Sequence, residues 1–111
     1  MAPTLWYHVR DFDAGRRFYL DTLGFEETAV DESERWSQLR CGEMEIGIAE
    51  GEPQPDGPVA HLDVDDVKGE ADRLRAAGVG VGVVVEIPQG ELRLVDVFDP
   101  DGNRIQLAQE M

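Results

Sequence analysis

The chain has 111 residues, which fits one compact domain, and its hydrophobic content of 41% is sufficient for a folded core. Its 24 acidic residues outnumber its 10 basic residues and give a formal net charge of −14. Such a surface repels phosphate backbones and anionic lipid headgroups, so the composition argues against nucleic-acid binding and membrane docking. It would attract cationic ligands, although for most of these charges we favour the alternative that they keep the protein soluble.

The first residues of the chain are not expected to be a signal peptide. They lack the basic and apolar segments of a signal peptide, and no apolar run approaches the roughly 18 residues that span a bilayer. We therefore expect a cytoplasmic protein. Cys41 is the only cysteine, so no intrachain disulfide can form, and with no base nearby in the sequence it is interpreted as structural.

The first unit, residues 1–50, has the pattern of a strand, a helix and three further strands. An alternating apolar strand at 5–9 is followed by a helical stripe between Asp11 and Gly24. The aspartate can cap the free N–H groups of the helix, and the glycine can adopt the left-handed conformation of a C-cap. The other predicted strands lie between turn signals, at residues 25–30, 36–40 and 45–50.

The second unit, residues 59–111, repeats the first. Residues 51–58 contain three prolines, cannot lie inside a helix or strand, and are predicted as the linker. The second helix extends from Asp65 to Gly78, with the same spacing as the first. The predicted strands of this unit are 60–64, 81–87, 92–98 and 104–109. The duplication predicts a single α+β domain over 1–111, in which two tandem βαβββ modules form a curved mixed sheet with a cleft.

Two segments carry the pattern of a known family. Residues 11–25 contain an aspartate, the Phe-Tyr pair Phe18 and Tyr19, and a final Leu-Gly-Phe; residues 99–107 read Asp-Pro-Asp-Gly-Asn-Arg-Ile-Gln-Leu. The first resembles the opening motif, and the second is similar to the closing motif, of the vicinal-oxygen-chelate superfamily of glyoxalases, bleomycin-resistance proteins and dioxygenases. The chain resembles most nearly the metal-free, bleomycin-resistance-like members. These motifs indicate the fold more than the reaction.

The resemblance also implies where a metal ion would bind. In metal-dependent members, four cleft positions hold His or Glu ligands, and by alignment these positions are Thr4, Gly47, Val59 and Gln106. A divalent cation needs imidazole nitrogens or carboxylate oxygens, and none of the four residues supplies them. We therefore expect the glyoxalase-type metal site to be dismantled, with no metal ion and no other cofactor.

Strand alternation indicates which side chains face the cleft, because successive side chains point to opposite faces of a sheet. Apolar residues such as Tyr7 and Leu62 are expected to face the helices, which leaves their neighbours for the cleft. The predicted ligand-binding residues are Trp6, His8, Trp36, Glu45, His61, Asp63, Arg104 and Gln106. No catalytic residue is predicted.

Several of these residues have two interpretations. His8 and His61 could form a displaced metal site with Glu45 or Asp63, but we favour two polar side chains on a half-solvated face, because two histidines without a fixed carboxylate fall short of a ligand set. The two indoles could stack on a planar or cationic ligand, worth about 0.5–2 kcal/mol for each cation–π contact, or could fill the core.

Three functions remain open. The favoured one is a binding protein that sequesters a cationic or aromatic small molecule, and the resemblance implies a homodimer with ligand crevices at the subunit interface. The alternative is a metal-dependent lyase, isomerase or dioxygenase of the glyoxalase type that uses an unaligned ligand set. The third is a subunit or regulator whose cleft binds no small molecule.

Overall fold

The structure is a computed structural model that describes residues 5–54, 56–87 and 91–111. The described part contains two mixed β-sheets with a helix against each. The elements in chain order are β1 (Trp6–Val9), α1 (Phe12–Arg17), the π-helical segment η1 (Phe18–Thr22), β2 (Glu26–Asp31), β3 (Trp36–Cys41), β4 (Met44–Glu50), β5 (Ala60–Asp63), α2 (Val67–Ala76), β6 (Gly80–Val81), β7 (Val85–Glu86), β8 (Leu92–Phe98) and β9 (Arg104–Glu110).

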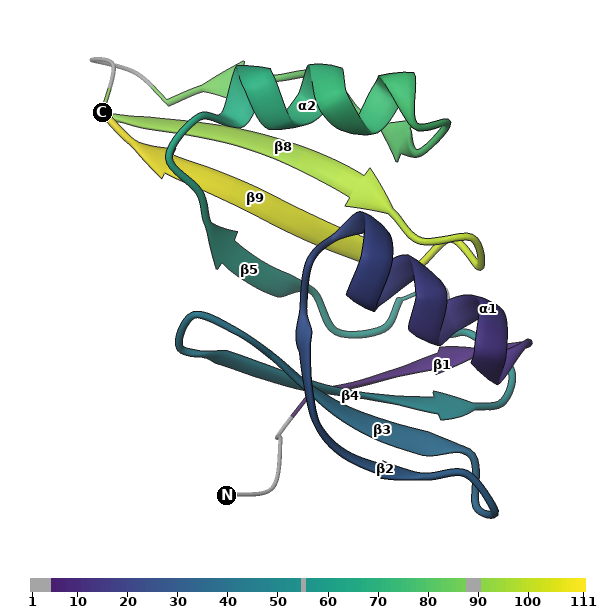
Figure 1. The fold of residues 1–111 in the computed structure, drawn as a ribbon. Coiled ribbons are helices and arrows are strands. Elements are labelled where there is room, and N and C mark those ends of the chain that lie inside the picture. Colours follow the sequence, from purple (N-terminus) through teal and green to yellow (C-terminus); the bar gives the residue numbers. More distant parts are fainter. Residues whose placement is uncertain (1–4, 55, 88–90) are drawn as a thin grey trace.

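The two halves of the chain share one topology. The first sheet has the order β1-β4-β3-β2, with β1 parallel to β4. The second has the order β5-β9-β8-β6, with β5 parallel to β9 and with β7 also paired to β8. Figure 1 shows α2 lying along the second sheet and α1 beside β1. The predicted α+β class is confirmed.

Aspartates cap the N-termini of both helices, as the sequence predicts. Asp11 accepts a hydrogen bond from the Ala14 amide, and Asp66 accepts one from the Gly69 amide, which satisfies free N–H groups of the first turns. Gly24 has φ +82°, so it adopts the left-handed conformation expected just after a helix. In the described part of the chain, no helix is long and apolar enough to cross a membrane.

Two sequence-based expectations need correction. The last turn of the first helix is π-helical, over Phe18–Thr22, rather than α-helical. The strand predicted over 81–87 is divided into β6 and β7. Gly82 lies at the break and has no side chain to pack; the Arg75 guanidinium donates to its carbonyl oxygen (2.8 Å). Residues 88–90, between the strands predicted at 81–87 and 92–98, lie outside the described residues.

One buried cluster connects the two halves of the chain. It contains Ile46 and Ile48 from the first sheet, Val95 and Leu107 from the second, and apolar side chains of both helices. Alternation along each strand directs these side chains towards the helices. The intervening side chains therefore form an open face on each sheet, on the side away from its helix.

Polar contacts fix the junction between the sheets. The Tyr7 hydroxyl donates to the Arg104 carbonyl oxygen and accepts from the Ala60 amide, both at 2.6 Å. The Tyr19 hydroxyl donates to a carboxylate oxygen of Asp99 (2.8 Å). β1 and η1 of the first half are thereby joined to β5, β9 and the 99–103 turn of the second.

The turn at 99–103 is held mainly by one buried carboxylate. Asp99 accepts from the backbone amides of Asp101 and Asn103, both at 2.9 Å, and from the Asn103 side-chain amide at 2.8 Å. The same Asn103 amide donates to the carbonyl oxygen of His8 (2.8 Å). The closing motif of the sequence is therefore a structural element of the junction.

Candidate functional site

The open face of the first sheet carries both tryptophans of the chain. Trp6 on β1 lies opposite Gly47 on β4, and its indole covers that glycine so closely that a Cβ atom at Gly47 would overlap the ring. Trp36 on β3 packs edge-to-face against Trp6, with ring centroids 6.2 Å apart and an interplanar angle of 82°. Both indoles are half-buried, so this pair exposes an aromatic surface.

His8 and Glu45 lie on the same face as the indole pair. His8 is half-buried and its ring lies against Gly51, where a Cβ atom would be 3.0 Å from the imidazole Cδ2. Glu45 is half-buried on β4, opposite Arg40 of β3. Four of the eight predicted ligand-binding residues are therefore together on one surface.

The other four lie on the open face of the second sheet. His61, Gln106 and Asp96 form one row across β5, β9 and β8. His61 Nδ1 lies 3.0 Å from Gln106 Oε1, and Gln106 Nε2 donates to Asp96 Oδ1 at 3.4 Å. Arg104 forms an ion pair with the same aspartate, with Nη1 3.5 Å from Oδ2. Asp63 follows on β5 and is exposed.

Sequence reasoning missed two residues of this face, Asp96 and Phe98. Both lie on β8, where they alternate with the buried Val95 and Val97. Applying the alternation rule to this strand, as to its neighbours, could have found them. Asp96 matters most, because it contacts both Gln106 and Arg104.

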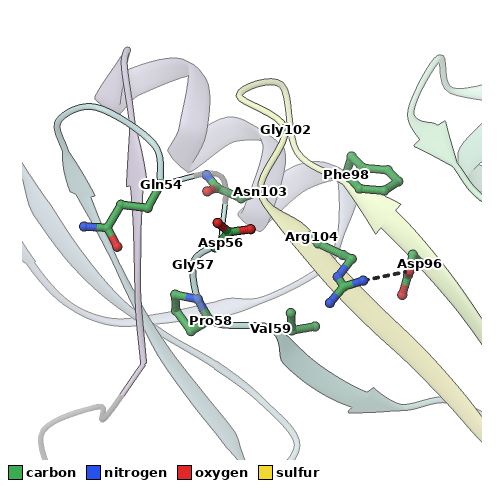
Figure 2. Close-up of a pocket in the computed structure, with 10 residues that line it drawn as sticks. All are labelled: Gln54, Asp56, Gly57, Pro58, Val59, Asp96, Phe98, Gly102, Asn103 and Arg104. Carbon is green, nitrogen blue, oxygen red and sulfur yellow. Dashed lines mark ion pairs between the residues drawn. The ribbon is translucent and has the colours of Figure 1, made fainter.

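A cavity of about 470 Å³ opens at the Arg104 end of this face. Figure 2 shows the ion pair of Arg104 and Asp96 on one side and the backbone of residues 56–59 on the other. Val59 and Phe98 add apolar surface, and Asp56 adds a second carboxylate. The volume of the cavity is in the range of small-molecule sites. The carboxylates of Asp96 and Asp56 outnumber the single guanidinium of Arg104, so the lining has an excess of negative charge.

A second cavity, of about 360 Å³, lies at the other side of the row. It is bounded by the turn between β3 and β4 and by His61 and Asp63 of β5. Cys41 contributes to its wall, and burial raises the pKa of the Cys41 thiol. A thiol with a raised pKa is a weak nucleophile at neutral pH, which fits the structural interpretation of this cysteine.

The two groups of predicted residues do not share either of these two cavities. Among the described residues, the lining of these two cavities includes His61, Asp63 and Arg104 but neither Trp6 nor Trp36. The structure therefore divides the predicted residues into two groups, Trp6, His8, Trp36 and Glu45 on the first sheet and His61, Asp63, Arg104 and Gln106 on the second.

The described residues do not fit a metal ion at the aligned positions. The Trp6 indole covers Gly47, Val59 has no donor, and Gln106 already contacts His61 and Asp96. Thr4 lies outside the described residues. Elsewhere in the described chain, no three His, Cys, Asp or Glu side chains come together as a metal site. Within one chain, His8 lies on the first sheet and His61 on the second.

The chain is similar to proteins of known structure. The fold resembles that of the genomically encoded fosfomycin resistance protein FosX from Listeria monocytogenes, with 18% identity, a TM-score of 0.81, and coverage of 100% of this chain and 93% of that one. It also resembles a lactoylglutathione lyase from Agrobacterium tumefaciens, with 19% identity, a TM-score of 0.78, and coverage of 98% and 92%. Both identities are low, so these likenesses concern the fold.

A third similar structure is TnmS3, an antibiotic binding protein from Streptomyces sp. CB03234, with 27% identity, a TM-score of 0.72, and coverage of 100% of this chain and 98% of that one. The search of curated proteins found no match. The model of one family matches residues 4–107, almost the whole chain. The chain therefore belongs to the Glyoxalase/Bleomycin resistance protein/Dioxygenase superfamily.

Proposed function

We propose that this protein binds a planar aromatic compound with a positive charge, and that it sequesters the compound without a metal ion and without changing it chemically. The observation that carries the proposal is the Trp6 indole lying over Gly47. The family resemblance aligns Gly47 with a position where metal-dependent members hold a ligand side chain. An aromatic wall at that position favours stacking over metal coordination.

The charge of the molecule supports a cationic ligand. The net charge of −14 attracts cations, and the indole faces of Trp6 and Trp36 can form cation–π contacts, each worth about 0.5–2 kcal/mol. The similarity to TnmS3 at 27% identity adds support, since that protein is described as an antibiotic binding protein.

We further propose that the working unit is a cytoplasmic homodimer. Each subunit would be one domain, 1–111, with modules 1–50 and 59–111 around the linker 51–58. Because neither tryptophan lines the two cavities beside His61 and Arg104, a second copy could bring its second sheet opposite the first sheet of its partner. The resemblance to bleomycin-resistance proteins, with crevices at the subunit interface, supports this arrangement.

Intrinsic fluorescence provides a direct test, because both tryptophans of the chain lie in the proposed site. The purified protein is titrated with 9-aminoacridine, a planar cation, and with acridine, the same ring system in neutral form, at about pH 8, where acidic side chains are ionised. We expect 9-aminoacridine to quench the fluorescence saturably, and acridine to bind about tenfold more weakly, which corresponds to one cation–π contact.

Chelation with EDTA before the titration should leave the affinity unchanged. Equal affinity for the two acridines would contradict the cationic ligand class. If neither of the two compounds quenched the fluorescence, and no member of a broader set of planar cations did so, the proposed function would be wrong.

A further inference from the structure

The polar row on the second sheet has a fixed direction. Gln106 lies in the middle, between His61 on β5 and Asp96 on β8, and each pair is in register across neighbouring strands. A primary amide has an acceptor oxygen on one side and N–H donors on the other, so Gln106 can satisfy its neighbours in only one orientation.

Asp96 determines that orientation. As a carboxylate it can only accept hydrogen bonds, so it faces the Gln106 amide nitrogen, at 3.4 Å, and not the amide oxygen. The ion pair with Arg104, in which Nη1 and Oδ2 are 3.5 Å apart, holds the carboxylate at this end of the row. The Gln106 oxygen is then left facing His61 Nδ1, at 3.0 Å.

The amide oxygen requires a donor from the imidazole. A ring with its proton on Nε2 would direct the lone pair of Nδ1 at the lone pairs of the Gln106 oxygen, which is repulsive. We infer that neutral His61 is held with its proton on Nδ1, so that its Nε2 lone pair is presented on the open face as a hydrogen-bond acceptor. This reverses the preference of free histidine, which carries the proton on Nε2.

Two acidic residues line the same cavity as His61. Asp63 lies two residues along β5, and Glu43 lines the same cavity as His61. Either carboxylate could instead accept from a proton on Nε2, and this is the competing arrangement. The arrangement with the proton on Nδ1 is favoured, because among the described residues the imidazole contacts the Gln106 side chain.

The tautomer of His61 also determines which ligands the second sheet favours. This step rests on the proposed function, whereas the tautomer itself does not. A lone pair at Nε2 accepts from a ligand N–H or O–H group and offers nothing to a ligand acceptor. The Asp96 carboxylate in the same row is likewise only a hydrogen-bond acceptor. The second sheet is therefore expected to favour a planar cation that carries N–H or O–H donors.

The tautomer can be measured without a ligand. In two-dimensional ¹H–¹⁵N spectra of the imidazole rings, recorded at about pH 8.5 where histidine is ordinarily neutral, the two tautomers give different cross-peak patterns. We expect the Nδ1–H pattern for His61, with His8, the only other histidine, as an internal comparison. An Nε2–H pattern for His61 overturns the inference and identifies Glu43 or Asp63 as the partner of the ring.

Two variants test the origin of the tautomer. Asp96→Asn allows the Gln106 amide to turn over, and Gln106→Leu removes the acceptor, so both should return His61 towards Nε2–H. Asp72→Asn removes the same charge from the exposed surface of α2, away from the row, and should leave the pattern unchanged. If His61 kept the Nδ1–H pattern in both row variants, the row would not be its cause.

A matched pair of ligands tests the ligand class. 9-Aminoacridine and 10-methylacridinium are both planar cations, but the first alone has N–H donors. We expect both to quench tryptophan fluorescence, the first to move the His61 Nε2 resonance, and His61→Phe to weaken the first alone by about fivefold, the effect of one hydrogen bond. Quenching by both with an unmoved Nε2 resonance rejects the ligand class. No quenching by either rejects the proposed function and leaves the tautomer result standing.

Discussion

Gly47 shows how one missing side chain determines what a surface can bind. Any Cβ atom at this position would overlap the Trp6 indole, so the ring can lie over β4 only because residue 47 is glycine. We expect Gly47→Ala to displace the indole and to lower the free energy of unfolding by about 1–3 kcal/mol, the usual cost of overpacking. Urea unfolding gives the energy, and a red shift of the tryptophan emission reports the greater exposure of the ring.

Gly80 offers a matched control for that substitution. It also lies in a strand, β6, but an added Cβ atom would be 3.7 Å from Phe98, an ordinary van der Waals contact. Gly80→Ala should therefore leave the free energy of unfolding within about 0.5 kcal/mol of the original and leave the emission unchanged. Equal losses in the two variants would mean that general glycine effects, and not the Trp6 contact, explain the result.

At the scale of single residues, part of the candidate site could be predicted from the sequence and part could not. Period-two alternation separated Trp6 and His8 from Tyr7 and Val9, because each strand alternates between a helix and an open face. The indole resting on Gly47 was not predictable, because that contact depends on the pairing register of β1 with β4. The orientation of Gln106 likewise needs its neighbour Asp96, which is distant in the chain.

At the scale of elements, local signals and long-range ones differed in the same way. The helix caps were predictable because Asp11 and Gly24 act on their own turns. The break between β6 and β7 was not, because the local sequence does not reveal the contact in which Arg75 from α2 donates to the Gly82 carbonyl oxygen. Sequence patterns thus located the elements, whereas tertiary contacts determined how regular each one is.

The junction between the sheets gives the protein an alkaline limit. Burial, reinforced by the charge of Asp99, raises the pKa of Tyr7 from 10.0 to about 12. Unfolded Tyr7 therefore loses its proton near pH 10 and folded Tyr7 only near pH 12. Across this window the unfolded state binds fewer protons, so the free energy of unfolding should fall as the pH rises from 10 to 12, with the full contribution present below pH 10.

Tyr7→Phe separates this contribution from others. Without the hydroxyl, the buried Ala60 amide loses its partner, so the variant should be about 1–3 kcal/mol less stable at neutral pH. Its melting temperature should fall less steeply between pH 10 and 12 than that of the original protein. Some decrease of the melting temperature with pH should remain, because the pKa of Tyr19 is also raised, mainly by burial and then by the negative charge of Asp99. An unchanged slope would show that Tyr7 does not titrate in this window.

At the scale of the whole molecule, the proposed homodimer makes each binding site depend on two chains. Trp36→Ala alters the open face of the first sheet and His61→Phe alters that of the second, so each variant alone should bind 9-aminoacridine several-fold more weakly than the original protein. If a site combines the first sheet of one copy with the second sheet of its partner, a dimer of one variant with the other contains one damaged site and one intact site. If each site lies within a single chain, that mixed dimer contains no intact site.

The mixed dimer is obtained by unfolding and refolding the two variants together, with one carrying an affinity tag for separation. Sedimentation equilibrium should first give a mass of about twice the 12.3 kDa chain. Titration of the isolated mixed dimer should then recover one acridine for every two chains, with the affinity of the original protein. A monomeric mass would remove the dimer from the proposal, and a mixed dimer that binds no better than its parents would assign the site to a single chain.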